Sequence, residues 1–219
     1  MLQFDTASTP QSKQLRDALL LVIGPPGAGR GTLCRRLARR AGARRLAVGD
    51  LLRDAVAAGS PLGRVAARFM ARGFLVPDRV VLNVVYQRMR EIATRDGGTT
   101  DELRKAASGF VLDGLPRTLR QAEALHAWFM TRPIDAVVVF DLDSGVATRG
   151  LSGRGRFDDG MRAVQRGREI YEQLIPPVIS WLAQRTKVVR VDAVREPNAI
   201  QVEVVQQLEQ VGLSCTPPR

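Results

Sequence analysis

The stretch from Gly24 to Thr32, GPPGAGRGT, has the residue types needed to surround an anion with backbone N–H groups. Glycines let a tight loop turn its amides toward phosphate oxygens, and the N-terminus of a following helix adds partial positive charge. The apolar run at 18–24 and the helical pattern after the loop supply the strand-to-helix context that such a loop requires. The segment therefore predicts a phosphate-binding loop.

One position in this loop departs from the usual pattern. Arg30 stands where loops of this kind place a lysine. Lysine is a compact point charge, whereas a guanidinium group is larger, planar and suited to forked hydrogen bonds. We expect phosphate binding to be preserved and phosphoryl transfer to be weakened, because this chemistry depends on positioning and electrostatics.

The overall charge also favours an anionic ligand. The formal net charge is +11, carried by 30 arginines and only 3 lysines. Such a balance suits nucleic acids, anionic membranes or small polyphosphates. Aromatic residues, which stack on bases, make up only 5% of the chain, so we favour small anions. The arginine-rich segment 34–45 could form a nucleic-acid face, but a solvated helix surface is the favoured interpretation.

The elements that position these residues alternate between strands and helices. Continuous apolar runs, typical of strands buried on both faces, occur at 18–24, 44–48, 110–114, 135–143 and 186–193. Helical patterns separate them, with a polar surface loop expected at 95–109. We predict a doubly wound α/β fold with a parallel sheet of about five strands flanked by helices. Ligands of such sheets bind at the carboxyl ends of the strands, here just after Ile23, Val48, Leu112 and Val139.

We expect the chain of 219 residues to form one domain with short tails. We expect tails at 1–17 and 213–219 around a domain spanning 18–212. No apolar run approaches the roughly 20 residues that would span a bilayer. Cys34 and Cys215 cannot form a zinc site alone, so two reduced thiols in a cytoplasmic protein are expected.

Four sequence blocks together resemble the adenylate kinase family of nucleoside-monophosphate kinases. They are GPPGAGRGT, VGDLLR, GFVLDGLPRTLRQAEAL, and GRFDD followed by YEQLIPPVI, within residues 19–193. The resemblance implies reversible, Mg²⁺-dependent transfer from ATP to AMP, giving two ADP. It also implies a helical acceptor-binding insertion at about 49–78 and a short, metal-free lid at about 151–160.

The same resemblance implies roles for individual residues. Arg30, Arg117, Arg149, Arg154 and Arg156 would act on the transferring phosphate. The residues implied to bind ATP are Gly24, Gly27, Ala28, Gly29, Arg30, Gly31, Thr32 and Arg149. The residues implied to bind AMP are Val48, Gly49, Arg53, Leu75, Val76, Gly114, Arg117 and Gln121, with Gly73 beside them. Asp113 and Asp50 would hold water around Mg²⁺.

Besides Arg30, three positions depart from the family pattern. Val48 replaces a threonine near the acceptor base, and Leu115 replaces an aromatic residue. Gly167 falls where the family has an arginine on the helix after the lid. Arg166 and Arg168 flank it, but adjacent helical positions point about 100° apart. Either the helix is re-registered so that one of them reaches the site, or a transition-state arginine is missing.

These features leave three functional hypotheses. The first is an adenylate kinase, favoured over a UMP- or CMP-type kinase by Gln121 after the Pro116-Arg117 pair. The second is an impaired relative that binds adenine nucleotides as a sensor or scaffold, motivated by Arg30 and Gly167. The third is a nucleic-acid binder. We expect the first: a monomeric cytoplasmic enzyme whose partners are ATP, AMP and ADP, with neither nucleic acid nor membrane.

Overall fold

A five-stranded parallel sheet forms the centre of the molecule. The computed structural model describes residues 12–95, 109–128, 134–141 and 161–216. The strand order is β3-β4-β2-β5-β6. In chain order the strands are β2 (Leu19–Ile23), β3 (Arg44–Ala47), β4 (Phe110–Asp113), β5 (Ala136–Asp141) and β6 (Lys187–Asp192). The predicted parallel sheet of about five strands is confirmed.

The central strand is apolar throughout because helices cover both of its faces. All five residues of β2 are buried, and it pairs in parallel with β4 and β5. Successive side chains of a strand point to opposite faces. Leu19, Leu21 and Ile23 accordingly belong to one core cluster, and Leu20 and Val22 to the other.

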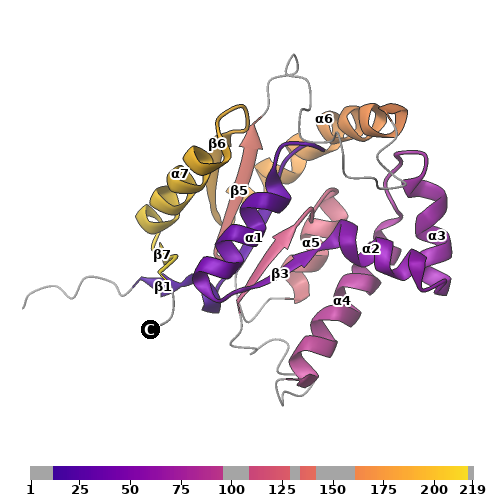
Figure 1. The fold of residues 1–219 in the computed structure, drawn as a ribbon, viewed down its shortest axis with the longest axis horizontal. Helices are drawn as coiled ribbons and strands as arrows, with labels where there is room; N and C mark the ends of the chain where they lie inside the picture. The colour runs from indigo at the N-terminus through magenta and orange to yellow at the C-terminus, as the bar shows by residue number, and fades with distance from the viewer. Residues whose placement is uncertain (1–11, 96–108, 129–133, 142–160, 217–219) are drawn as a thin grey trace, which may run out of the picture.

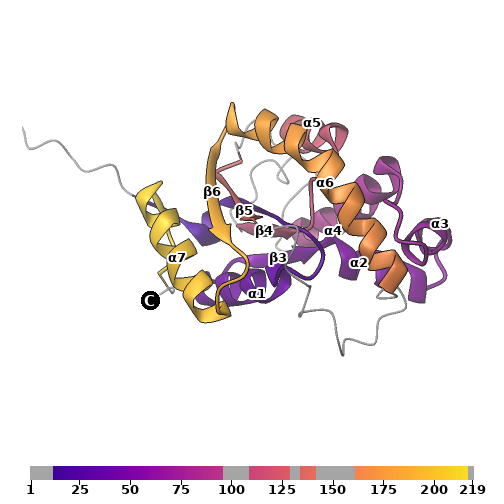
Figure 2. The same ribbon diagram turned by 90° about the horizontal axis from the view of Figure 1, so that it is seen from above.

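Two layers of helices enclose the sheet (Figure 1; Figure 2). One face packs against α1 (Arg30–Ala41) and α7 (Pro197–Gln210). The other packs against α4 (Asp78–Arg95), α5 (Leu119–Trp128) and α6 (Met161–Ala183). None of the helices in the described ranges is both long and apolar enough to cross a membrane.

A pair of helices follows the edge strand β3. These are α2 (Val48–Ala57) and α3 (Pro61–Met70). Ser60 caps α3 by accepting a hydrogen bond from the Gly63 amide at 3.0 Å, and Pro61 occupies the first turn. Gly63 lets the helices approach closely, since a Cβ there would lie 1.9 Å from the Ala55 carbonyl oxygen.

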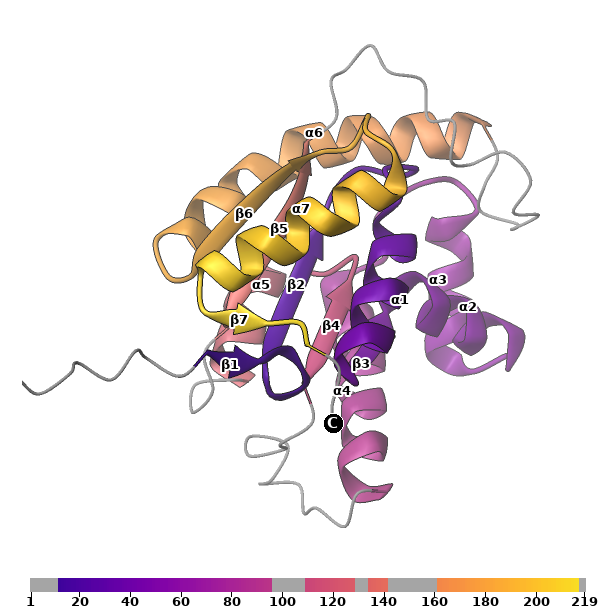
Figure 3. The same ribbon diagram turned by 60° about the vertical axis from the view of Figure 1, so that its left-hand side comes forward.

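The two chain ends extend further into the fold than the sequence suggested. Residues Lys13–Gln14 form β1, which pairs in parallel with β7 (Leu213–Ser214), as Figure 3 shows. The 3-10 turn Leu15–Asp17 follows β1 and buries Leu15 completely. Cys215 is also fully buried, rather than lying in a free tail. The expected tails at 1–17 and 213–219 therefore include residues, 13–17 and 213–215, that pack within the fold.

Candidate active site

The predicted phosphate loop joins β2 to α1, and its glycines are required by its geometry. Gly27 and Gly29 have φ values of 84° and 82°, in the left-handed region that favours glycine. A Cβ on Gly24 would lie 2.6 Å from Phe140 Cβ and 2.9 Å from Arg30 Cδ. The Gly29 carbonyl accepts the first amide bonds of α1, so the loop ends at a helix N-terminus.

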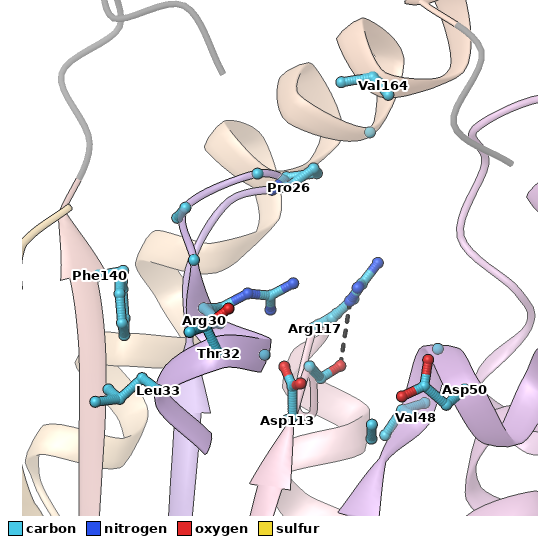
Figure 4. A pocket seen from close by; sticks show the side chains of 18 of the residues that line it. Pro26, Arg30, Thr32, Leu33, Val48, Asp50, Asp113, Arg117, Phe140 and Val164 are labelled. Carbon is cyan, nitrogen blue, oxygen red and sulfur yellow. Dashed lines mark hydrogen bonds between the residues drawn. The ribbon is translucent and has the colours of Figure 1, made fainter. Parts of the chain in front are cut away.

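A cavity of about 800 Å³ opens beside this loop at the carboxyl ends of β2, β3 and β4. Figure 4 shows side chains from the loop, α2, β4 and α6 converging around it. It collects nearly all the predicted binding residues that the structure describes. Those lining it are Gly27, Ala28, Gly29, Arg30, Gly31, Thr32, Val48, Gly49, Asp50, Arg53, Gly73, Leu75, Val76, Asp113, Gly114, Arg117 and Gln121.

Four predicted residues are not part of that group. Gly24 does not line the cavity, but because it has no side chain it leaves space for the side chain of Arg30. The arginines expected on the lid, Arg149, Arg154 and Arg156, lie outside the described residues.

Arg30 and Arg117 point into the same part of the cavity (Figure 4). A Cβ on Gly114 would lie 3.4 Å from Arg117 Nη2 and 3.7 Å from Arg30 Nη1, so both guanidinium groups lie above this glycine. Arg117 Nε donates to the Gly114 carbonyl at 3.2 Å. Burial and the neighbouring charge of Arg30 lower the pKa of Arg117 to about 10. Two like charges directed into one cavity favour an anion between them.

A chain of alternating charges forms the floor of the cavity. Arg53 Nη2 lies 2.6 Å from Asp50 Oδ1, and Arg45 Nη1 lies 3.2 Å from Asp50 Oδ2. Arg45 Nη2 also contacts Asp113 Oδ2 at 2.6 Å. Burial opposes the charge of Arg45, but the hydrogen bond to Asp113 and the negative charges of Asp113 and Asp50 together outweigh it and raise the pKa of Arg45. The sequence analysis did not identify Arg45, because its partner Asp113 lies 68 residues further along the chain.

One wall of the cavity, beside α2, is apolar, and the amide side chain of Gln121 is held by hydrogen bonds behind it. Val48 and Val76 are buried and line the wall there. Gln121 is 2% exposed; its Oε1 accepts from the Arg117 amide at 2.7 Å and its Nε2 donates to Asp78 Oδ1 at 2.7 Å. These bonds fix the amide in one orientation at the cavity wall.

Gly167 faces the cavity from α6, and neither flanking arginine replaces it. Arg166 donates to the Arg72 carbonyl at 3.0 Å and stacks 4.7 Å from the centroid of the Phe74 ring. Arg168 Nε donates to Glu172 Oε1 at 3.0 Å. The helix α6 runs from Met161 to Ala183, and of these three residues only Gly167 lines the cavity formed by the described residues.

Comparisons with known proteins agree with this geometry. The family model described as adenylate kinase matches residues 22–187. The chain is 37% identical over 194 residues to an adenylate kinase of Parasynechococcus marenigrum, covering 88% of this chain and 97% of that protein. It is 38% identical over 195 residues to an adenylate kinase of Xanthomonas campestris pv. campestris, covering 86% and 98% of the two chains. The matched residues 22–187 thus include the glycine-rich loop and the segments from α2, β4 and α6 that line the cavity.

Proposed function

This chain belongs to the adenylate kinase family and is an adenylate kinase-like phosphotransferase, and we propose that its cavity binds ATP and AMP end to end for direct transfer. Arg30 and Arg117 carry this proposal. Their converging guanidinium groups supply two positive charges at the point where the phosphates of donor and acceptor would meet.

The donor phosphates belong at the phosphate loop. We assign their binding to the amides of residues 27–32, to the hydroxyl of Thr32 and to the guanidinium group of Arg30. Loop amides and a helix N-terminus bind polyphosphates without regard to the base. Arg154 and Arg156, from a short lid at about 151–160, and Arg149, just before it, are proposed to complete this side.

The acceptor belongs between α2 and β4. We assign the AMP phosphate to Arg53 and Arg117 and the base to the wall formed by Val48, Leu75 and Val76, with Gln121 facing its polar edge. The residues 49–78 would thus act as the acceptor-binding insertion. Because Val48 offers no hydroxyl, base selection would rest largely on Gln121 and on shape.

Among the described residues, the carboxylate of Asp113 is suited to hold Mg²⁺ through a water molecule. Mg²⁺ keeps several waters and is held by few protein carboxylates plus substrate phosphates. Asp113 lines the cavity and has one oxygen engaged by Arg45, which leaves the other for a metal-bound water. Both oxygens of Asp50 are engaged by arginines, so we assign the metal-water role to Asp113 alone. When bound, Mg²⁺ would neutralise charge on the donor phosphates.

The protein's own contribution to transfer is positioning and charge. Arg30 and Arg117 would hold the two phosphates in line and stabilise negative charge on the transferring group. Gly167 supplies no charge, so we propose turnover below that of a family member with arginine there. We also propose a cytoplasmic monomer, in keeping with two free cysteines.

ADP formation with AMP, UMP or CMP as acceptor tests the function. We expect Mg²⁺-dependent turnover of ATP with AMP and at least tenfold lower kcat/KM with UMP and CMP. Faster turnover with a pyrimidine acceptor would overturn the assignment of the base site. Absence of turnover with every acceptor would overturn the enzymatic role, and binding of ATP without turnover would instead support a nucleotide sensor.

A further inference from the structure

Arg45 is a charged residue of the cavity floor to which the proposed function gives no role. It lies between the two carboxylates of the floor, 3.2 Å from Asp50 and 2.6 Å from Asp113. Resting on the proposed function, we propose that Arg45 is a positioning residue that neutralises Asp113 and Asp50, so that the nucleotide polyphosphate binds almost equally well with and without Mg²⁺.

The position of Arg45 beneath the phosphate loop supports this role. A Cβ on Gly31 would lie 3.2 Å from Asp113 Oδ2 and 3.3 Å from Arg45 Nη2, so the ion pair lies directly against the loop backbone. The side chains of Arg45 and Asp113 are only 19% and 10% exposed. Charges held this close to the loop, with little water around them, act strongly on a bound phosphate.

The balance of charge explains the effect on metal dependence. Arg53, Asp50, Arg45 and Asp113 alternate in sign and sum to zero. Without Arg45 the floor would carry one net negative charge beneath a polyanion, and a metal ion would be needed to offset it. With Arg45 in place, a metal-free polyphosphate meets a neutral floor and two arginines, Arg30 and Arg117, above it.

An arginine is required for contact with both carboxylates. Its planar fork places Nη1 on Asp50 and Nη2 on Asp113 at the same time. The Arg45 Nε is buried and makes no hydrogen bond among the described residues, so the two outer nitrogens make the contacts that hold the guanidinium group. Lysine would keep the charge at this position but lose the double contact.

Titration calorimetry of ATP, with AMP absent, tests the proposal in EDTA and again in excess MgCl₂. The natural protein is expected to show affinities within about threefold of one another. R45Q should weaken metal-free ATP by about tenfold and Mg-ATP by less than threefold, because the metal offsets the exposed carboxylates. R45K should retain most of the metal-free affinity.

Two further variants separate charge from structure. R44Q removes the same charge from the neighbouring residue of β3, whose side chain points to the other face of the strand, and should leave both affinities within twofold. R45Q/D113N removes both members of the ion pair and should restore metal-free affinity toward that of the natural protein. This double variant also provides the test if R45Q alone does not fold.

The outcomes distinguish this inference from the proposed function. If ATP binds but R45Q weakens the metal-free and metal-bound forms equally, Arg45 has only a structural role and the inference is overturned. A tenfold preference of the natural protein for Mg-ATP would overturn it as well. If the natural protein binds ATP under neither condition, the proposed function itself fails.

Discussion

At the scale of single residues, Gly167 is the position where one side chain should change the rate most. Among the described residues, a Cβ there would meet only Pro26 Cγ at 3.6 Å and the Gly73 oxygen at 3.9 Å, which leaves space on the side of the phosphate loop for a longer side chain. Gly167→Arg should raise kcat on the order of tenfold or more, because a guanidinium group would stabilise the transferring phosphate. Steady-state ADP formation measures this change.

Gly167→Gln is the matched control, since it adds a polar side chain of similar reach without charge. It should leave kcat near the natural value. Both variants remove a helical glycine, which should raise the free energy of unfolding by about 0.5–1 kcal/mol. Equal rates for the arginine and glutamine variants would show that the missing charge does not limit turnover.

Arg117 makes nucleotide binding sensitive to alkaline pH. Burial and repulsion by Arg30 lower its pKa to about 10 in the free protein, below its ordinary value. Its charged form is therefore disfavoured by folding, and a bound phosphate should raise the pKa again. We expect ATP binding at pH 10 to take up about half a proton, with affinity falling as the pH rises further.

Calorimetry in two buffers of different ionisation enthalpy measures this uptake. Arg117→Gln should bind ATP more weakly and take up no proton at the same pH. Tyr171 does not interfere, because burial raises its pKa to about 12. Proton uptake that persists in Arg117→Gln would place the titrating group elsewhere.

At the scale of elements, the sequence predicted the strands and helix ends that are marked by residues close together in the chain. β2 and β5 are apolar runs that need cover on both faces, and Pro61 and Gly42 mark helix ends through their backbone preferences. The pair β1–β7 has two residues in each strand and depends on contact between the chain ends, so no local pattern announces it. Arg45 was missed for the same reason, because its partner Asp113 lies on a different strand.

A substitution at the contact between α2 and α3 should weaken the binding of AMP more than the binding of ATP. Gly63→Ala places a methyl group where a Cβ would lie 1.9 Å from the Ala55 carbonyl oxygen, which forces the two helices apart. Overpacking of this kind costs about 1–3 kcal/mol. Since α2 carries Arg53, AMP affinity should fall at least tenfold while ATP affinity changes less than threefold.

Val65→Ala, at a 38% exposed site on α3, is the control and should change neither affinity. Equal losses of affinity for both nucleotides in Gly63→Ala would contradict the assignment of α2 to the acceptor.

At the scale of the whole molecule, the two cysteines report whether the chain ends unfold with the core. Cys34 on α1 and Cys215 after β7 are both fully buried in the same core cluster, and burial raises the pKa of each thiol, that of Cys215 to about 11. Thiol reagents react with the thiolate, so neither cysteine should be labelled in the native protein and both should be labelled in denaturant. ATP at about 100 times its Kd should slow labelling of both by roughly 100-fold, because ligand binding stabilises the folded state by about 2.7 kcal/mol. Rapid labelling of Cys215 with Cys34 still protected would mean that the β1–β7 pair opens independently of the sheet, and the fold would then consist of two units of unequal stability.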